Sequence, residues 1–131
     1  MLDSEIQSYK DIILETCGVN TKKCMVCGKC SGTCPNYDAM EYHPHQFVQM
    51  VENGEIEKLL TSKSIYACLS CFACLERCPR QVEPAKVIEA VRNVVEKARG
   101  GNHLEPEDIP AMLDSDTPQQ LLVSEFRKYR K

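Results

Sequence analysis

The fold is decided by the stretch Cys24-Met-Val-Cys27-Gly-Lys-Cys30-Ser-Gly-Thr-Cys34-Pro35. The same spacing of cysteines and proline returns 44 residues later as Cys68-Leu-Ser-Cys71-Phe-Ala-Cys74-Leu-Glu-Arg-Cys78-Pro79. These two runs use eight of the nine cysteines, and Cys17 is left over. The 131-residue chain therefore contains an internal repeat of one kind of site.

The spacing C-x2-C-x2-C-x3-C-P is typical of bacterial ferredoxins, in which cysteine thiolates hold [4Fe–4S] clusters. Three thiolates on one tight loop can each bind a different iron of the cubane. In two-cluster ferredoxins the last cysteine of the other run binds the fourth iron. We therefore expect two [4Fe–4S] clusters with crossed ligands. The expected ligands are Cys24, Cys27, Cys30 and Cys78 for cluster 1, and Cys68, Cys71, Cys74 and Cys34 for cluster 2.

Other cysteine chemistries fit the spacing less well. Structural zinc usually takes two separated cysteine pairs for each tetrahedral site, although two zinc sites remain an alternative by count. Thioredoxin-like chemistry needs one C-x-x-C pair beside a βαβ pattern, and no such pattern is visible. Disulfides are typical of exported proteins, and the opening MLDSEIQSYK has no apolar stretch of a secretory signal. The sequence thus favours iron–sulfur clusters in a cytoplasmic protein.

Charge and hydropathy exclude two classes of partner. Lys and Arg number 16 and Asp and Glu number 19, so the net charge is −3. No basic stripe is present that could bind phosphate groups and so release their counterions, which argues against nucleic acid as a partner. No apolar run approaches the length that a membrane-spanning helix requires, so we expect no membrane span.

Hydrophobic spacing predicts an all-α fold. We expect a helix over 3–16, a second from Pro44 to just before Gly54, a third from Pro84 to just before Gly100, and a last one opening at Thr117. No stretch shows the alternation of a strand. The predicted organisation is an N-terminal helix over 1–20, an α-helical dicluster ferredoxin domain over 21–100, and a loop with a C-terminal docking helix over 101–131.

The chain resembles HdrC, an iron–sulfur subunit of heterodisulfide reductase. Besides the two cysteine runs, the resemblance rests on Glu41-Tyr-His-Pro-His-Gln46, and it extends from about Thr21 to Val95. Where many relatives have Arg before that Gln, this chain has His45. The resemblance implies the α-helical ferredoxin fold, two [4Fe–4S] clusters and a place in a hetero-oligomeric complex. There HdrC passes electrons between a flavin- and cluster-containing A-like subunit and a catalytic B-like subunit.

Several alternatives stay open at this point. The helical ferredoxin domain of succinate dehydrogenase and the iron–sulfur subunit of glycolate oxidase have similar runs. An independent dicluster ferredoxin and a zinc-stabilised interaction module are further alternatives. The sequence has neither an adjacent Cys-Cys-Gly pair nor a Gly-x-Gly-x-x-Gly nucleotide loop, so we expect electron transfer without catalysis by this chain.

Outside the two runs, three groups of residues have competing interpretations. Cys17 is expected to be a buried, inert thiol rather than a ligand. His43 and His45 are expected to cap a helix or face solvent rather than bind metal. The cations that flank the clusters either are simply solvated or raise the reduction potential of the clusters; they are Lys22, Lys23, Lys29, Arg77 and Arg80.

Overall fold

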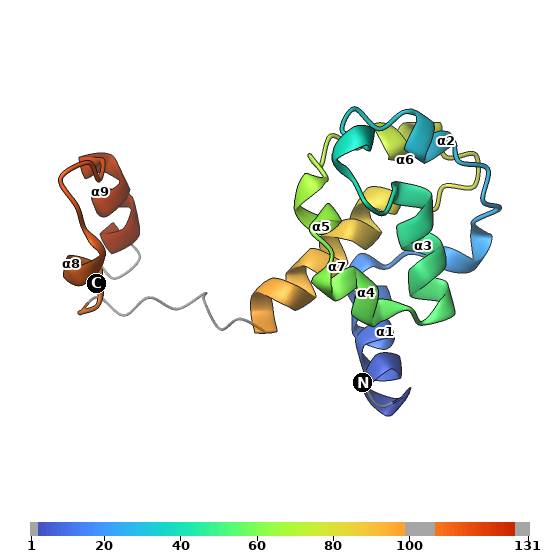
Figure 1. Ribbon diagram of the computed structural model, residues 1–131, viewed down its shortest axis with the longest axis horizontal. Helices are drawn as coiled ribbons and strands as arrows, with labels where there is room; N and C mark the ends of the chain where they lie inside the picture. The colour runs from blue at the N-terminus through green and yellow to red at the C-terminus, as the bar shows by residue number, and fades with distance from the viewer. Residues whose placement is uncertain (1–2, 99–106, 128–131) are drawn as a thin grey trace. The chain divides into compact units, whose positions relative to one another are not determined.

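A computed structural model describes residues 3–98 and 107–127 of the chain (Figure 1). Within these residues the regular structure is entirely helical, which confirms the predicted all-α fold. The chain divides into two compact units, Met1–Ala98 and Arg99–Lys131. Both cysteine runs belong to the first unit, so this unit holds the candidate site.

The helices of the first unit follow one another with short connections. They are α1 (Asp3–Cys17), η1 (Thr21–Lys23), α2 (Lys29–Gly32), η2 (Tyr37–Ala39), α3 (Pro44–Asn53), α4 (Ile56–Thr61), α5 (Ser64–Ala67), α6 (Ala73–Arg77) and α7 (Pro84–Ala98). The short helices α2 and α6 each lie inside one cysteine run. The longer α1, α3 and α7 match the helices predicted from hydrophobic spacing.

Helix α7 is the centre of the first unit. It packs against α1, α3, α4 and α5, and Figure 1 shows it crossing the unit behind the shorter helices. Its apolar stripe includes Val87, Ile88 and Val91, which are fully buried together with Phe47 of α3. A 3.6-residue repeat of apolar side chains places such a stripe on one face, and burial of that face stabilises the helix. This stripe therefore belongs to the core of the first unit.

The ends of α3 are set by local chemistry. Pro44 opens the helix, where its missing N–H removes no helical hydrogen bond. The backbone N–H of His43 donates to Oε1 of Gln46 at 2.8 Å, and the ring of His43 stacks on Tyr37 with centroids 3.8 Å apart. At the other end Gly54 has a φ of 80°, a left-handed conformation that favours glycine. His43 therefore stands at the helix cap, one of its two expected roles.

The second unit contains α8 (Ile109–Met112) and α9 (Gln119–Arg127). Ile109 is buried within it, whereas Leu121 and Val123 are more than half exposed. In the first unit, α1 packs on α7 and so belongs with the ferredoxin helices. The finer division at residues 20 and 100, and the docking role of the last helix, stay predictions.

Candidate iron–sulfur centres

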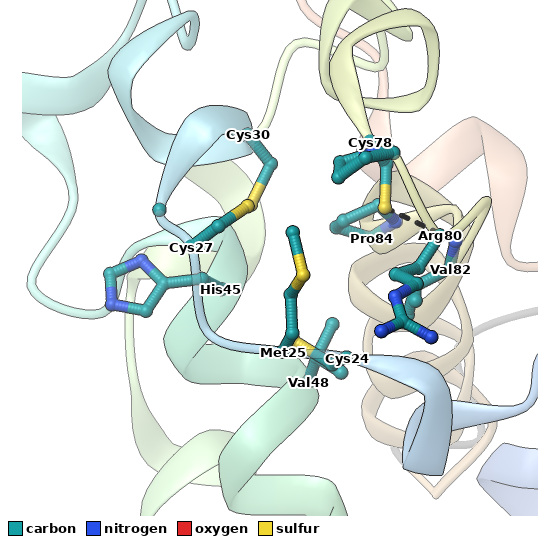
Figure 2. Close-up of a pocket in the computed structure, with 12 residues that line it drawn as sticks. Cys24, Met25, Cys27, Cys30, His45, Val48, Cys78, Arg80, Val82 and Pro84 are labelled. Carbon is teal, nitrogen blue, oxygen red and sulfur yellow. Dashed lines mark hydrogen bonds between the residues drawn. The ribbon is translucent and has the colours of Figure 1, made fainter.

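Four cysteines from the two runs surround one pocket in the first unit. Cys24, Cys27 and Cys30 come from the first run, and Cys78 is the last cysteine of the second run. The empty space in the pocket, open solvent included, is about 350 Å³. Figure 2 shows the labelled cysteines on opposite walls of this space. We call these four residues site 1.

The second pocket has the complementary set, which we call site 2: Cys68, Cys71, Cys74 and Cys34. Its empty space is also about 350 Å³. In each site three cysteines come from one run and the fourth is the last cysteine of the other run. This is the grouping that crossed ligation requires. The assignment of individual ligands stays a prediction.

The two loops repeat in their backbone as well as in their sequence. Val26 and Ser70 occupy matching positions and have φ values of 56° and 53°; Gly28 and Phe72 match with 73° and 60°. A left-handed conformation costs a residue with a side chain about 1–2 kcal/mol, so the second loop bears this strain at Phe72, where the first loop has glycine. Burial repeats too, because Cys27 and Cys71 are exposed while Cys30 and Cys74 are buried. Each loop therefore presents one exposed and one buried thiol.

Burial disfavours the thiolate form of the two inner cysteines. Desolvation raises the pKa of Cys30, and hydrogen bonds with Ser31 offset part of this increase. Desolvation also raises the pKa of Cys74 to about 11. Metal binding deprotonates a coordinating thiol outright, because the cation replaces the lost hydration of the anion. The inner cysteines thus suit a cationic iron centre better than a free thiolate.

Backbone N–H groups approach the sulfurs of site 1. Val26 donates to Sγ of Cys24 at 3.5 Å, and Val82 donates to Sγ of Cys78 at 3.3 Å. Hydrogen bonds of this kind to cluster sulfurs tune the reduction potential. Val82 lies outside both cysteine runs, so the spacing of the cysteines could not indicate it.

His45 contributes a polar wall to site 1 without pointing into it. Its Nδ1 lies 2.5 Å from Oγ of Ser31, the residue after Cys30. Figure 2 shows the ring turned away from the middle of the pocket. Burial, and to a smaller extent the nearby His43, lowers the pKa of His45 below its ordinary value. His45 thus contacts Ser31 beside the first run, and the expectation that it binds no metal stays a prediction.

A site for one metal ion is the alternative to a cluster at these cysteines. Among residues 3–98 and 107–127, no three His, Cys, Asp or Glu side chains form a group that could hold one ion. In a four-cysteine zinc site each sulfur lies about 2.3 Å from the ion. The described residues therefore give no support to a zinc site.

Cys17 lies apart from both pockets. It is half-buried at the end of α1, and its thiol donates to the carbonyl oxygen of Leu14 at 3.5 Å. Burial raises its pKa, which makes the thiol less reactive. The position agrees with an inert role, and the role itself stays a prediction.

Arg92 of α7 is a residue that the sequence pattern did not indicate. Its guanidinium donates to the carbonyl oxygens of Ile65 at 2.7 Å and Cys68 at 2.9 Å. These hydrogen bonds hold the start of the second cysteine run against α7. From the sequence alone, an arginine on an amphipathic helix is expected to face solvent. The partners of Arg92 could not be recognised there, because they lie 24 and 27 residues earlier in the chain.

The 4Fe-4S dicluster domain family matches residues 23–83, which contain both cysteine runs and all of site 1 and site 2. The C2 subunit of the H2/formate:CoB-CoM heterodisulfide,ferredoxin reductase of Methanococcus maripaludis is 34% identical over 70% of this chain and 48% of its own length. The chain is an HdrC-like iron–sulfur protein. It binds [4Fe–4S] clusters, and the predicted cofactor is thereby confirmed.

Two further curated relatives of the HdrC-like chain belong to the same kind of enzyme. The iron–sulfur C 2 subunit of the CoB–CoM heterodisulfide reductase of Methanocaldococcus jannaschii is 33% identical over 74% of this chain and 50% of its own. The C subunit of the H2:CoB-CoM heterodisulfide,ferredoxin reductase of Methanothermobacter thermautotrophicus is 28% identical over 70% and 50%. The HdrC-like chain thus spans about half the length of these relatives.

The helices of the HdrC-like chain do not have the character of membrane spans. In the described part of the chain, none is both long and apolar enough to cross a bilayer. This agrees with the hydropathy of the sequence.

Proposed function

We propose that the chain is an electron-relay subunit of a heterodisulfide reductase-like complex. One observation carries the proposal: site 1 and site 2 are joined through a buried cluster of Cys30, Cys74 and Ala85. Each of the two sites also has an exposed cysteine, Cys27 or Cys71. A route with two surface ends and a buried middle suits the passage of electrons through the chain.

The proposed ligands are the cysteines that line each pocket. Site 1 would hold one cluster through Cys24, Cys27, Cys30 and Cys78; site 2 would hold the other through Cys68, Cys71, Cys74 and Cys34. A [4Fe–4S] cluster supplies one-electron chemistry, and the protein supplies its position and potential. The chain itself would transform no substrate.

The proposed partners are an A-like subunit with flavin and iron–sulfur clusters and a B-like catalytic subunit. Support comes from the relatives, whose names place them in heterodisulfide reductases. The same names favour this complex over one like succinate dehydrogenase or glycolate oxidase. We place the complex in the cytoplasm, because reduced cysteines persist in reducing compartments.

The test is purification of the full chain under anaerobic conditions, followed by iron and sulfide analysis and electron paramagnetic resonance (EPR). We expect about eight iron and eight sulfide per chain, as two cubanes require. The isolated chain should accept electrons from dithionite and reduce no disulfide. Anaerobic pull-down from the native cell should recover the flavin-containing and catalytic subunits.

An independent ferredoxin is the second candidate, and the same pull-down separates it from the relay subunit. Recovery of the chain alone, together with rapid electron exchange with soluble oxidoreductases, would support the ferredoxin. Disulfide reduction by the isolated, cluster-loaded chain at the rate of the complex would contradict both.

A further inference from the structure

The internal repeat makes it possible to compare the two sites position by position. In each run the last cysteine is followed by proline and then by one further residue. That residue is Asn36 in the first run and Arg80 in the second. Because the last cysteines cross over, Arg80 lines site 1 and Asn36 lines site 2. Matching positions thus place a cation at one site and a neutral amide at the other.

Arg80 is well placed to act on site 1. Figure 2 shows its side chain extending along the wall of the pocket from the region of Cys78 toward Cys24. No ion pair joins Arg80 to a carboxylate in the part of the chain that the structure describes. The guanidinium of an arginine carries a positive charge. Its positive charge therefore acts on site 1 without neutralisation by a described carboxylate.

Asn36 is engaged differently at site 2. Its Nδ2 donates to the carbonyl oxygen of Ala67 at 2.7 Å, so the amide links the residue after the first run to the residue before the second. The other residues that line site 2 are uncharged and include Leu69, Phe72 and Met40. Site 2 thus has an apolar wall with no ionic group in contact with the pocket.

Hydrogen bonds and neighbouring charges add to the difference. Val26 and Val82 donate backbone N–H groups to site 1 sulfurs, and Ser31 interacts with Cys30. At site 2, Sγ of Cys34 lies 4.0 Å from Sδ of Met40, and the sulfur of Cys74 accepts one backbone hydrogen bond, from Ala85. Two cations, one directly before the first run and one inside it, are replaced by alanine 44 residues later: Lys23 by Ala67 and Lys29 by Ala73.

Positive charge and hydrogen bonds to sulfur both stabilise the reduced, more negative state of a cluster. We propose that site 1 has the higher reduction potential, with Arg80 as its main determinant, and that electrons run from site 2 to site 1. This inference rests on the ligand sets under the proposed function. A one-electron donor such as a reduced viologen gives one electron to site 2. Site 2 then returns to its oxidised state as site 1 gains that electron, and no bond or proton moves.

The experiment is an anaerobic redox titration of the full, cluster-loaded chain followed by EPR. Cys27→Ser and Cys71→Ser, which alter one proposed ligand each, assign the two signals to site 1 and site 2. We expect the site 1 signal to appear first as the potential is lowered. Arg80→Asn should shift the midpoint of site 1 to lower potential and leave that of site 2 in place. Arg80→Lys should keep the higher midpoint, because it preserves the charge.

Asn36→Arg is the matched variant at the other site, and it should raise the midpoint of site 2. Iron content and thermal stability of the Arg80 variants should equal those of the wild type, which separates a tuning role from a structural one. Asn36→Arg removes the hydrogen bond to Ala67 and could lose iron for that reason. In that case the comparison of Arg80→Asn with Arg80→Lys still tests the inference. An Arg80→Asn midpoint equal to that of the wild type, or a site 2 signal that appears first, overturns the inference. Failure of the ligand sets looks different, because Cys27→Ser and Cys71→Ser would then not alter separate signals.

Discussion

Cys30 and Cys74, the third cysteines of the two runs, are buried together with Ala85 of α7. They occupy equivalent positions in the repeat, and α2 packs on α6 around them. Each belongs to a different cysteine-lined pocket. The two halves of the repeat therefore contact each other where site 1 adjoins site 2, and this contact is buried.

Crossed ligation can be tested with the last cysteine of each run. Cys78→Ser should alter the EPR signal of site 1 and leave that of site 2, because Cys78 lines the pocket of the first run. Cys34→Ser should do the reverse. Each variant removes one of four proposed thiolate ligands, and we expect its site to lose most of its iron. Iron analysis and EPR of the anaerobic protein measure both effects.

Cys17→Ser is the control for these variants. Its thiol hydrogen-bonds to Leu14 and lines neither pocket, so the iron content should stay at the wild-type value. A fall in iron toward half would make Cys17 a ligand. Local ligation would be indicated if Cys78→Ser altered the site of its own run.

The sequence predicted the parts of the site that depend on local spacing. The two runs indicated which cysteines share a loop, and Pro44, Gly54 and Pro84 marked helix ends correctly. Contacts between distant segments were not predictable in the same way. The Val82 N–H that donates to Cys78 depends on how the chain turns after the run. The anchoring by Arg92 depends on the packing of α7 on α5.

The core around α3 and α7 should determine the stability of the first unit. Phe47 is fully buried in a cluster with Val51, Ile88 and Val91. Phe47→Ala removes this contact area and leaves a cavity, so we expect a loss of about 3–5 kcal/mol in the free energy of unfolding. Anaerobic urea unfolding followed by circular dichroism measures it.

Ile12→Ala serves as the matched control for the core variant. Ile12 lies on α1 and is 45% exposed. A substitution at such a position usually changes stability by less than about 0.5 kcal/mol. Equal losses for Phe47→Ala and Ile12→Ala would contradict the assignment of Phe47 to the core.

His45 should make stability depend on pH near neutrality. Burial lowers its pKa in the folded chain, so the unfolded chain takes up the proton first as the pH falls. The stabilising contribution is therefore present above the ordinary pKa of 6.5 and is lost as the pH falls through the lower folded value. We expect the melting temperature of the cluster-loaded chain to fall less between pH 7.5 and 5.5 in His45→Gln than in the wild type. Parallel curves for the two proteins would show that His45 contributes nothing.

Arg92 should matter more to site 2 than to site 1. Its guanidinium donates to the carbonyl oxygens of Ile65 and Cys68, and Cys68 begins the second run. Arg92→Met leaves both carbonyls without this donor, and hydrogen bonds to charged groups contribute about 1.5–3 kcal/mol each. We expect a loss of at least about 2 kcal/mol in stability, together with earlier loss of the site 2 EPR signal during chelator treatment.

Two further variants on α7 test whether this stabilisation of site 2 depends on the planar pair of donors in the guanidinium of Arg92. Arg92→Lys keeps the charge but not the planar pair of donors, so it should restore only part of the stability. Lys86→Met removes an exposed cation that pairs with Glu83 at 2.9 Å, and such surface pairs contribute about 0–1 kcal/mol. It should leave the chelator kinetics of both sites unchanged. Equal rates of iron loss from site 1 and site 2 in Arg92→Met would show that the arginine stabilises the whole unit and does not specifically hold the second cysteine run.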